Sequence, residues 1–119
     1  MKLFNLIFSI IIFTLLGVFS TELSAQSSQI ITEEIPVRGN CNMCKKRIEG
    51  AAQIKGVKLA EWTAETQSLK VIYKSDKTSK EEISKAVSAV GYDTGMMKGD
   101  STAYKNLPHC CQYREVAPH

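Results

Sequence analysis

Hydrophobic and polar residues alternate in several short runs of the chain, and this period of two predicts β-strands. In the first run Ile35 and Val37 alternate with polar neighbours, and Pro36 between them favours a sheet edge or a strand end. The last run is short and is interrupted by Gly95. The strands are expected at residues 33–38, 57–63, 69–73 and 92–97.

Two stretches between these strands have apolar residues at helical spacing. The first covers residues 45–54 and is followed by Gly56, a typical residue after a helix end. The second begins at Ser79, which forms a capping-box pattern with Glu82, and Gly91 closes it. The apolar faces consist of Ile48, Ala51 and Ala52 in the first helix, with Cys44 one turn earlier, and of Ile83, Ala86, Val87 and Val90 in the second.

The order strand, helix, strand, strand, helix, strand is that of a split βαβ arrangement, an α+β fold. It predicts one four-stranded antiparallel sheet with both helices on one face. The ordered unit is about 65 residues long, a size at which many domains gain stability from a metal ion or a disulfide. The expected core residues are Trp62, Leu69, Val71, Ile83 and Val87.

The first 25 residues have the composition of a secretory signal peptide. Met1-Lys2 gives a short positive start, residues 3–19 are almost wholly apolar, and small residues at 23–25 offer a cleavage point. Cleavage there predicts a periplasmic or secreted protein. The alternative is a chain anchored in the membrane by residues 3–19, because this run is close to the minimum length that spans a bilayer.

The remaining chain divides into three parts by composition. Residues 26–32 are a polar, flexible leader, residues 33–97 form the folded domain, and residues 98–119 form a tail that contains cysteine and histidine and has no clear periodicity. The net charge is +3 and the charged residues are scattered, so we expect no nucleic-acid partner. No nucleophile–base pair and no phosphate-binding glycine loop is visible in the sequence. We therefore expect a monomer without enzyme activity and without a small-molecule substrate.

Four cysteines occur in two pairs, Cys41 with Cys44 and Cys110 with Cys111. The first pair lies between a predicted strand and a predicted helix, and the positive end of a helix favours the thiolate that binds metal. The same spacing occurs in redox dithiols, and an even number of cysteines in a short exported chain is typical of disulfides. All three interpretations of the pair stay open at this point.

Two thiols at this spacing can close on one soft metal ion. Thiolates select Cu(I), zinc and heavier thiophilic ions over magnesium or calcium. Structural zinc normally takes four ligands, whereas Cu(I) and Hg(II) accept two thiolates. The pair on the loop therefore favours Cu(I), with Hg(II), Zn(II) and Cd(II) as alternatives. A redox role is less favoured, because a thioredoxin-like motif lies in a different sheet of a longer chain.

The spacing of these residues resembles that of a heavy-metal-associated domain over residues 33–97. The matching positions are Cys41-x-x-Cys44, Ile48-Glu49, Ala51, Gly56-Val57, Val71-x-Tyr73, Ile83, Ala86 and Gly91-Tyr92. Such domains occur as soluble copper chaperones, as the periplasmic mercury-binding protein and as modules of metal-pumping ATPases. The resemblance implies a ferredoxin-like βαββαβ fold with the thiols on an exposed loop. It also implies that metal is given by or passed to a partner, which we expect to be a membrane transporter or an efflux protein.

Two features depart from this family. Its members usually have Gly-Met-Thr before the first cysteine, with the methionine packed under the loop, but here Gly39-Asn40 precedes Cys41. Met43 lies near the expected site, between the cysteines, and is not equivalent to that methionine. The second departure is the tail segment 107–113, which the simple family domain lacks.

Tyr92 is expected near the metal loop, since in this fold the fourth strand begins beside the end of the first. Its phenol could shield the thiolates from water, or the ring could only pack against its neighbours. A role as a direct ligand is not expected, because a phenol stays protonated near neutral pH.

The tail residues His109, Cys110 and Cys111 are further candidate ligands. An extended chain gains up to ~3.3 Å per residue, so the tail is long enough to return to the first site. We expect Cys110 or Cys111, together with His109, to complete or relay metal at the first pair. The alternatives are a disulfide from the tail to Cys41 or Cys44 and an independent weak site on a mobile tail.

The sequence as a whole predicts an exported protein that binds and transfers Cu(I) through Cys41 and Cys44, as a copper chaperone or buffer. One alternative is the binding of mercury or another thiophilic ion for a transporter. Another is a disulfide-stapled interaction module that uses the fold without metal.

Overall fold

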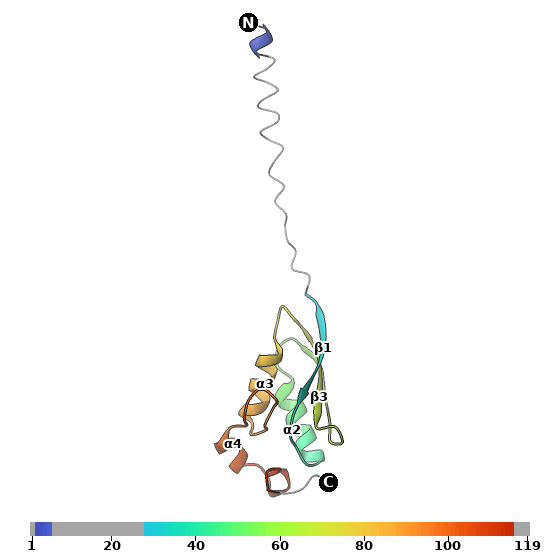
Figure 1. The fold of residues 1–119 in the computed structure, drawn as a ribbon, viewed down its shortest axis with the longest axis vertical. Coiled ribbons are helices and arrows are strands. Elements are labelled where there is room, and N and C mark those ends of the chain that lie inside the picture. The colour runs from blue at the N-terminus through green and yellow to red at the C-terminus, as the bar shows by residue number, and fades with distance from the viewer. Residues whose placement is uncertain (1, 6–27, 116–119) are drawn as a thin grey trace.

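The computed structural model describes residues 2–5 and 28–115 (Figure 1). Most of the expected signal peptide, and with it the alternative membrane anchor, lies outside the described residues. None of the helices in the described ranges is long and apolar enough to cross a membrane. The elements are β1 (Ile30–Pro36), α2 (Asn42–Ala52), β2 (Val57–Thr63), β3 (Ser68–Lys74), α3 (Lys80–Ala89), α4 (Ser101–Lys105) and the 3₁₀ turn η1 (His109–Cys111).

The three strands form one antiparallel sheet in the order β1-β3-β2. Leu69 at the centre pairs with Ile35 on one side and with Trp62 on the other. Every second residue of β3 is buried, and the buried residues of β1 and β2 pair with these, which places all of them on one face of the sheet. Helices α2 and α3 pack against each other and against this sheet (Figure 1). The expected α+β class and antiparallel sheet are therefore confirmed, and the predicted core residues are all buried.

The fourth strand expected at residues 92–97 is not present, and the expectation of a four-stranded sheet was wrong for the described chain. This segment makes one isolated bridge, between Val37 and Thr94. Thr94 then closes a local turn, because its N–H donates to the carbonyl of Met97 at 2.9 Å and its hydroxyl accepts from the Met97 N–H at 3.1 Å. Gly95 donates to the carbonyl of Pro36 at 2.9 Å. The turn bends the chain away before a ladder can form.

The element boundaries differ from the expected ones mainly at the first strand and the first helix. Strand β1 begins at Ile30, inside the stretch expected to be a flexible leader. Pro36 is the last residue of this edge strand, so a ladder donor is not needed there. Helix α2 begins at Asn42, three residues earlier than expected, and so includes Cys44 in its first turn. In α3 the Ser79 hydroxyl caps the helix by accepting from the Glu82 N–H at 3.2 Å.

The tail, which has no clear periodicity in the sequence, folds back onto the domain and contains α4 and η1. Figure 1 shows α4 beside α3 and the red end of the chain next to the first turn of α2. Gly91 makes this return possible, because it has φ +101° and a Cβ there would lie 2.8 Å from the Tyr104 backbone nitrogen. Four tail residues join the hydrophobic core: Tyr104, Leu107, Cys111 and Tyr113.

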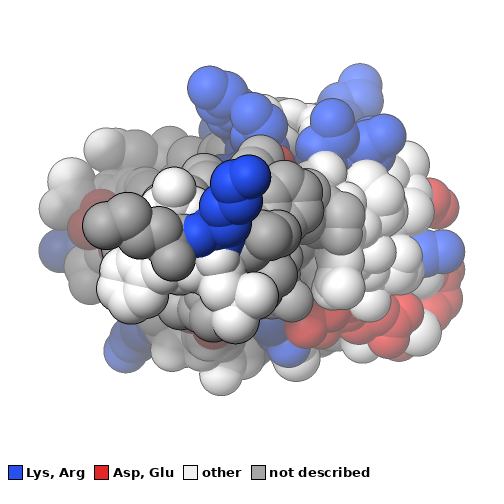
Figure 2. All heavy atoms as spheres, turned by 90° about the horizontal axis from the view of Figure 1, so that it is seen from above, with Lys and Arg blue, Asp and Glu red and all other residues white. Residues whose placement is uncertain are grey.

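The charged side chains are mixed on the face seen in Figure 2. Lysine and arginine side chains gather along one edge of this view, and acidic side chains lie on the same face. Lys45 and Glu49 are one helical turn apart in α2 and form an ion pair, with Lys45 Nζ 3.0 Å from Glu49 Oε2.

Candidate metal centre

The loop between β1 and α2 presents the first two thiols. Cys41 is the residue before α2 and has an extended backbone, with φ −145° and ψ 178°, while Cys44 lies in the first turn. The Cys41 carbonyl accepts from the Lys45 N–H at 3.0 Å, which closes that turn. The two sulfur atoms are 3.7 Å apart. The helix start therefore holds two thiols at a distance that one ion can bridge.

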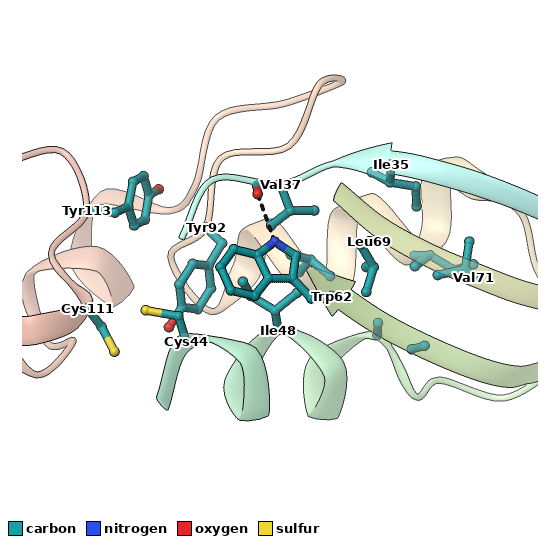
Figure 3. Close-up of a cluster of buried hydrophobic side chains, with 14 of the residues drawn as sticks. Ile35, Val37, Cys44, Ile48, Trp62, Leu69, Val71, Tyr92, Cys111 and Tyr113 are labelled. Atoms are coloured by element: carbon teal, nitrogen blue, oxygen red, sulfur yellow. Dashed lines mark hydrogen bonds between the residues drawn. The ribbon is translucent and has the colours of Figure 1, made fainter. Parts of the chain in front are cut away.

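The tail supplies a third thiol to the same place. Cys111 lies at the end of η1, and its Sγ is 3.9 Å from the Sγ of Cys41. The sulfur atoms of Cys41, Cys44 and Cys111 all lie within 4.8 Å of one another. In Figure 3 the side chains of Cys44 and Cys111 point towards each other from α2 and from the tail. Cys44 and Cys111 are fully buried, whereas Cys41 is partly exposed.

The other two tail candidates lie outside this group of three thiols. Cys110 Sγ is 4.0 Å from Cys111 Sγ and 3.7 Å from the Sδ of Met43, on the outer side of the site. His109 is exposed, and its imidazole is not part of the three-thiol group. All four cysteines are free thiols in this structure. The tail residue brought to the first pair is therefore Cys111.

The protonation of the thiols differs within the group. Burial works against ionisation of Cys41, but the backbone N–H groups of Cys44 and Met43 point at its sulfur and hold its pKa below the usual value. Burial and the neighbouring Cys44 thiol raise the pKa of Cys111. Cys41 is thus more ready than Cys111 to bind an ion as thiolate, and the group as a whole releases protons when metal binds.

Tyr92 closes the inner side of the group. The ring is fully buried, and its hydroxyl faces the sulfurs of Cys44 and Cys111 (Figure 3). Burial, followed by the charges of these two neighbours, raises the pKa of Tyr92, so the phenol stays protonated. Tyr92 therefore lies near the metal loop, as the sequence analysis predicted. A neutral phenol here excludes water and leaves the negative charge on sulfur.

The loop is supported from below by the indole of Trp62. A Cβ on Gly39 would lie 2.9 Å from Trp62 Cζ2, so the ring fills the space beside the loop. The indole N–H donates to the Val37 carbonyl at 2.9 Å (Figure 3). The Trp62 carbonyl accepts from Lys45 Nζ at 2.8 Å. The indole of Trp62 therefore packs directly against the loop at Gly39.

A polar and aromatic cluster fastens the tail. The Tyr113 hydroxyl donates to the Gly91 carbonyl at 2.9 Å and accepts from the Asp93 N–H at 2.8 Å. Its ring stacks on Tyr92 at a centroid distance of 5.7 Å. Arg114 donates to both oxygens of Asp93, at 2.6 and 3.3 Å. These contacts of Tyr113 and Arg114 therefore hold Cys111, two residues before Tyr113, beside the loop.

Four residues of the site were not expected from the sequence: Asn40, Asp93, Tyr113 and Arg114. Asn40 is fully buried beside Cys41, and its amide donates to the Cys110 carbonyl at 3.4 Å. The sequence feature that could have predicted the docking of the tail is its content of large apolar and aromatic residues, which a solvated tail does not need. Periodicity alone did not reveal it, because η1 and α4 are too short.

Solved structures of metal-handling proteins share this fold. The structure described as CopZ metallochaperone is 30% identical, covers 54% of this chain and 98% of that chain, and has a TM-score of 0.52. Oxidized MerP from Ralstonia metallidurans CH34 is 28% identical, covers 56% of this chain and 96% of that chain, and has a TM-score of 0.53. No protein-family model and no curated protein matches the sequence.

Proposed function

The chain belongs to the heavy-metal-associated domain family, and we propose that it binds one soft metal ion at Cys41, Cys44 and Cys111 and transfers it to a partner. The proposed cargo is Cu(I). The proposed partner is a membrane transporter or efflux protein that gives or takes the ion outside the cytoplasm. This role places the protein in the periplasm or in the secreted fraction, with residues 1–25 as its export signal.

The observation that carries the proposal is the group of three thiols within 4.8 Å. It consists of soft ligands alone, which select Cu(I) and other thiophilic ions over the oxygen-binding ions magnesium and calcium. Three donors are one fewer than the tetrahedral zinc site requires. Cu(I) is stable with two or three thiolates, and Hg(II) shares this property. Of the two ions, Cu(I) is the proposed cargo, as the cysteine pair already favoured in the sequence.

Binding and release need no catalytic group, so enzyme activity is not part of the proposal. The lowered pKa of Cys41 suits it to hold the ion as thiolate, and its partial exposure leaves one sulfur of the centre open to solvent. Cys44 and Cys111 then enclose the ion, and the neutral phenol of Tyr92 keeps water from the inner side.

Titration of the reduced protein with Cu(I) against a competing chelator tests the proposal. We expect one tightly bound ion per chain and loss of this binding in a Cys41→Ser/Cys44→Ser variant. The Cys111→Ser variant should bind at least about tenfold more weakly, since even an outer-shell change typically costs that much. X-ray absorption at the copper edge should report three sulfur neighbours in the wild type and two in Cys111→Ser.

The matched control is Cys110→Ser, which removes a tail thiol outside the group of three. This variant should keep one ion per chain, with three sulfur neighbours and an affinity close to that of the wild type. Weak uptake that is equal in all variants would contradict metal binding at this site. Thiols that are blocked in protein prepared without reductant, and that stay inert to metal, would favour the disulfide-stapled module.

A further inference from the structure

We propose that Met43 and Cys110 form a second, outer site through which a soft ion enters and leaves the three-thiol centre. This inference rests on the proposed function and adds the route that the ion takes. Its ligands are one thioether and one thiol, and its cargo class is soft monovalent or divalent ions such as Cu(I).

The two outer sulfur atoms are already paired at the surface. Cys110 Sγ lies 3.7 Å from Met43 Sδ, although the residues are 67 positions apart in the chain. Met43 is 47% exposed and Cys110 is partly exposed. Both sulfur atoms are therefore open to an incoming ion, and thioethers are ligands for soft ions.

The outer pair is connected to the inner centre through a short sulfur-to-sulfur step. Cys110 Sγ lies 4.0 Å from Cys111 Sγ, which in turn lies 3.9 Å from Cys41 Sγ. Cys44 and Cys111 are fully buried, so an external ligand cannot approach them directly. Exchange with a partner must therefore begin at exposed sulfur. Cys41 is one partly exposed thiol, and the outer pair offers two more such sulfur atoms on the side of the tail.

Transfer along this route is a ligand exchange without change of oxidation state. An ion held by Met43 Sδ and Cys110 Sγ forms a bond to Cys111 Sγ while its bond to the thioether breaks. Bonds to Cys41 and Cys44 then form as the bond to Cys110 breaks. Each thiol that joins as thiolate releases one proton to water, and Cys110 takes one up when it is released. The ion leaves by the same steps in reverse.

The thioether makes the outer site weak and selective at once. A neutral sulfur binds Cu(I) without the charge of a thiolate, so the ion is not trapped there. Ions that prefer oxygen gain little from this pair and are not passed inward. Lys46 and Arg47 line a shallow hollow with Met43, so an incoming anionic ligand is attracted to the same place.

Stopped-flow transfer of Cu(I) from the loaded protein to the anionic chelator bicinchoninate tests this route. We expect a Met43→Leu/Cys110→Ser variant to release the ion about tenfold more slowly, with an equilibrium affinity within about threefold of the wild type. Both positions are at the surface, so the fold should be unaffected. The matched control is Met96→Leu, because Met96 is 45% exposed and its Sδ lies 3.5 Å from the Ser84 hydroxyl of α3.

The outcomes separate this inference from the proposed function. Equal release rates in the wild type and the double variant, with tight binding in both, would overturn the outer site alone. A parallel loss of affinity and rate would place Cys110 in the centre itself and would also overturn it. A wild type that fails to bind Cu(I) would overturn the proposed function, and the outer site with it.

Discussion

The side-chain amide of Asn40 donates a hydrogen bond to the backbone carbonyl of Cys110, at 3.4 Å and across 70 positions of the chain. The same carbonyl lies 3.8 Å from the Sγ of Cys41. Asn40 belongs to the loop that lacks the methionine of its family, and Cys110 belongs to the tail that the simple family domain lacks. These two departures meet in one contact, so loop and tail form one structural unit.

Substitution of Asn40 by alanine should therefore loosen the tail. We expect Asn40→Ala to lower the free energy of unfolding by about 1 kcal/mol, because a buried side chain loses its hydrogen bond to the tail. Amide hydrogen exchange of Cys111, whose N–H donates to the Pro108 carbonyl, should become faster than in the wild type. Unchanged exchange at Cys111 would show that the contact does not hold the tail.

Gly91, just after α3, lies against the backbone of the tail residue Tyr104. We expect Gly91→Ala to destabilise the protein by about 1–3 kcal/mol, because alanine is strained at φ +101° and its Cβ would meet the Tyr104 backbone. The control is Gly50→Ala, which lies in α2 with open space around its Cβ and should stabilise the helix by about 0.5–1 kcal/mol. Urea denaturation of both variants measures the difference, and equal effects would contradict the prediction.

Much of the fold could be predicted because it is specified by neighbours in the sequence. Strand β2 has the bounds expected from alternation, and the Ser79 cap was visible as a pattern of two residues. The loop with Cys41 and Cys44 was found for the same reason, since its two thiols and the helix start lie within four residues. Local spacing is enough for such features.

The remaining structure depends on contacts between distant residues, which no local pattern encodes. Thr94 forms hydrogen bonds with Met97 that replace the expected fourth strand by a turn. Cys111 reaches the loop because Tyr113 and Arg114 bind to Gly91 and Asp93, 21 or 22 positions earlier. The cysteine pair in the tail indicated that a third ligand was available. The contacts of Tyr113 and Arg114 determine that Cys111, and not Cys110, lies beside Cys41 and Cys44.

The Gly39–Trp62 contact gives a prediction that a fluorescence spectrum can check. Gly39→Ala places a methyl group 2.9 Å from the indole, and such overpacking typically costs about 1–3 kcal/mol. Trp62 is the single tryptophan of the chain, so its emission reports the loop directly. We expect a red shift, because the displaced ring loses part of its burial. Emission and stability equal to those of the wild type would contradict the tight contact.

The Asp93–Arg114 ion pair predicts how stability changes in acid. Burial opposes ionisation of Asp93, but the Arg114 guanidinium and the Gly99 N–H hold its pKa below the ordinary value of 3.8. The Asp93 carboxylate therefore contributes to the free energy of unfolding above pH 3.8, and this contribution is lost as the pH falls through its lower folded-state pKa. We expect Arg114→Gln to cost about 1–2 kcal/mol at pH 7 and to weaken the acid dependence.

The control for this pair is Arg38→Gln. Arg38 also approaches Asp93, but the charged atoms are 3.9 Å apart and its side chain is 60% exposed. Such an exposed pair contributes less than about 1 kcal/mol. Thermal unfolding from pH 2 to pH 7 compares the two variants, and an equal loss in both would contradict the assignment of the anchor to Arg114.

Tyr113 predicts a second, alkaline limit to the docking of the tail. Burial, together with the Asp93 carboxylate, raises the pKa of Tyr113 to about 12, from an ordinary value of 10. The folded state therefore holds this proton more tightly than the unfolded state does. The contribution of Tyr113 is complete below pH 10 and is lost as the pH rises from there through 12.

Tyr113→Phe should remove this alkaline loss and should also lower stability at neutral pH. Its hydroxyl pairs with the Gly91 carbonyl and the Asp93 N–H, so the variant leaves two backbone groups without that partner, at a cost of about 1–3 kcal/mol.

The control is Tyr73→Phe, because Tyr73 lies in the sheet away from the tail. Burial and Glu33 raise the pKa of Tyr73 to about 12 as well. Only Tyr113→Phe should weaken Cu(I) binding, since only Tyr113 helps to hold Cys111 beside the loop. Equal loss of Cu(I) affinity in Tyr73→Phe would mean that general destabilisation, and not release of the tail, controls the third thiol.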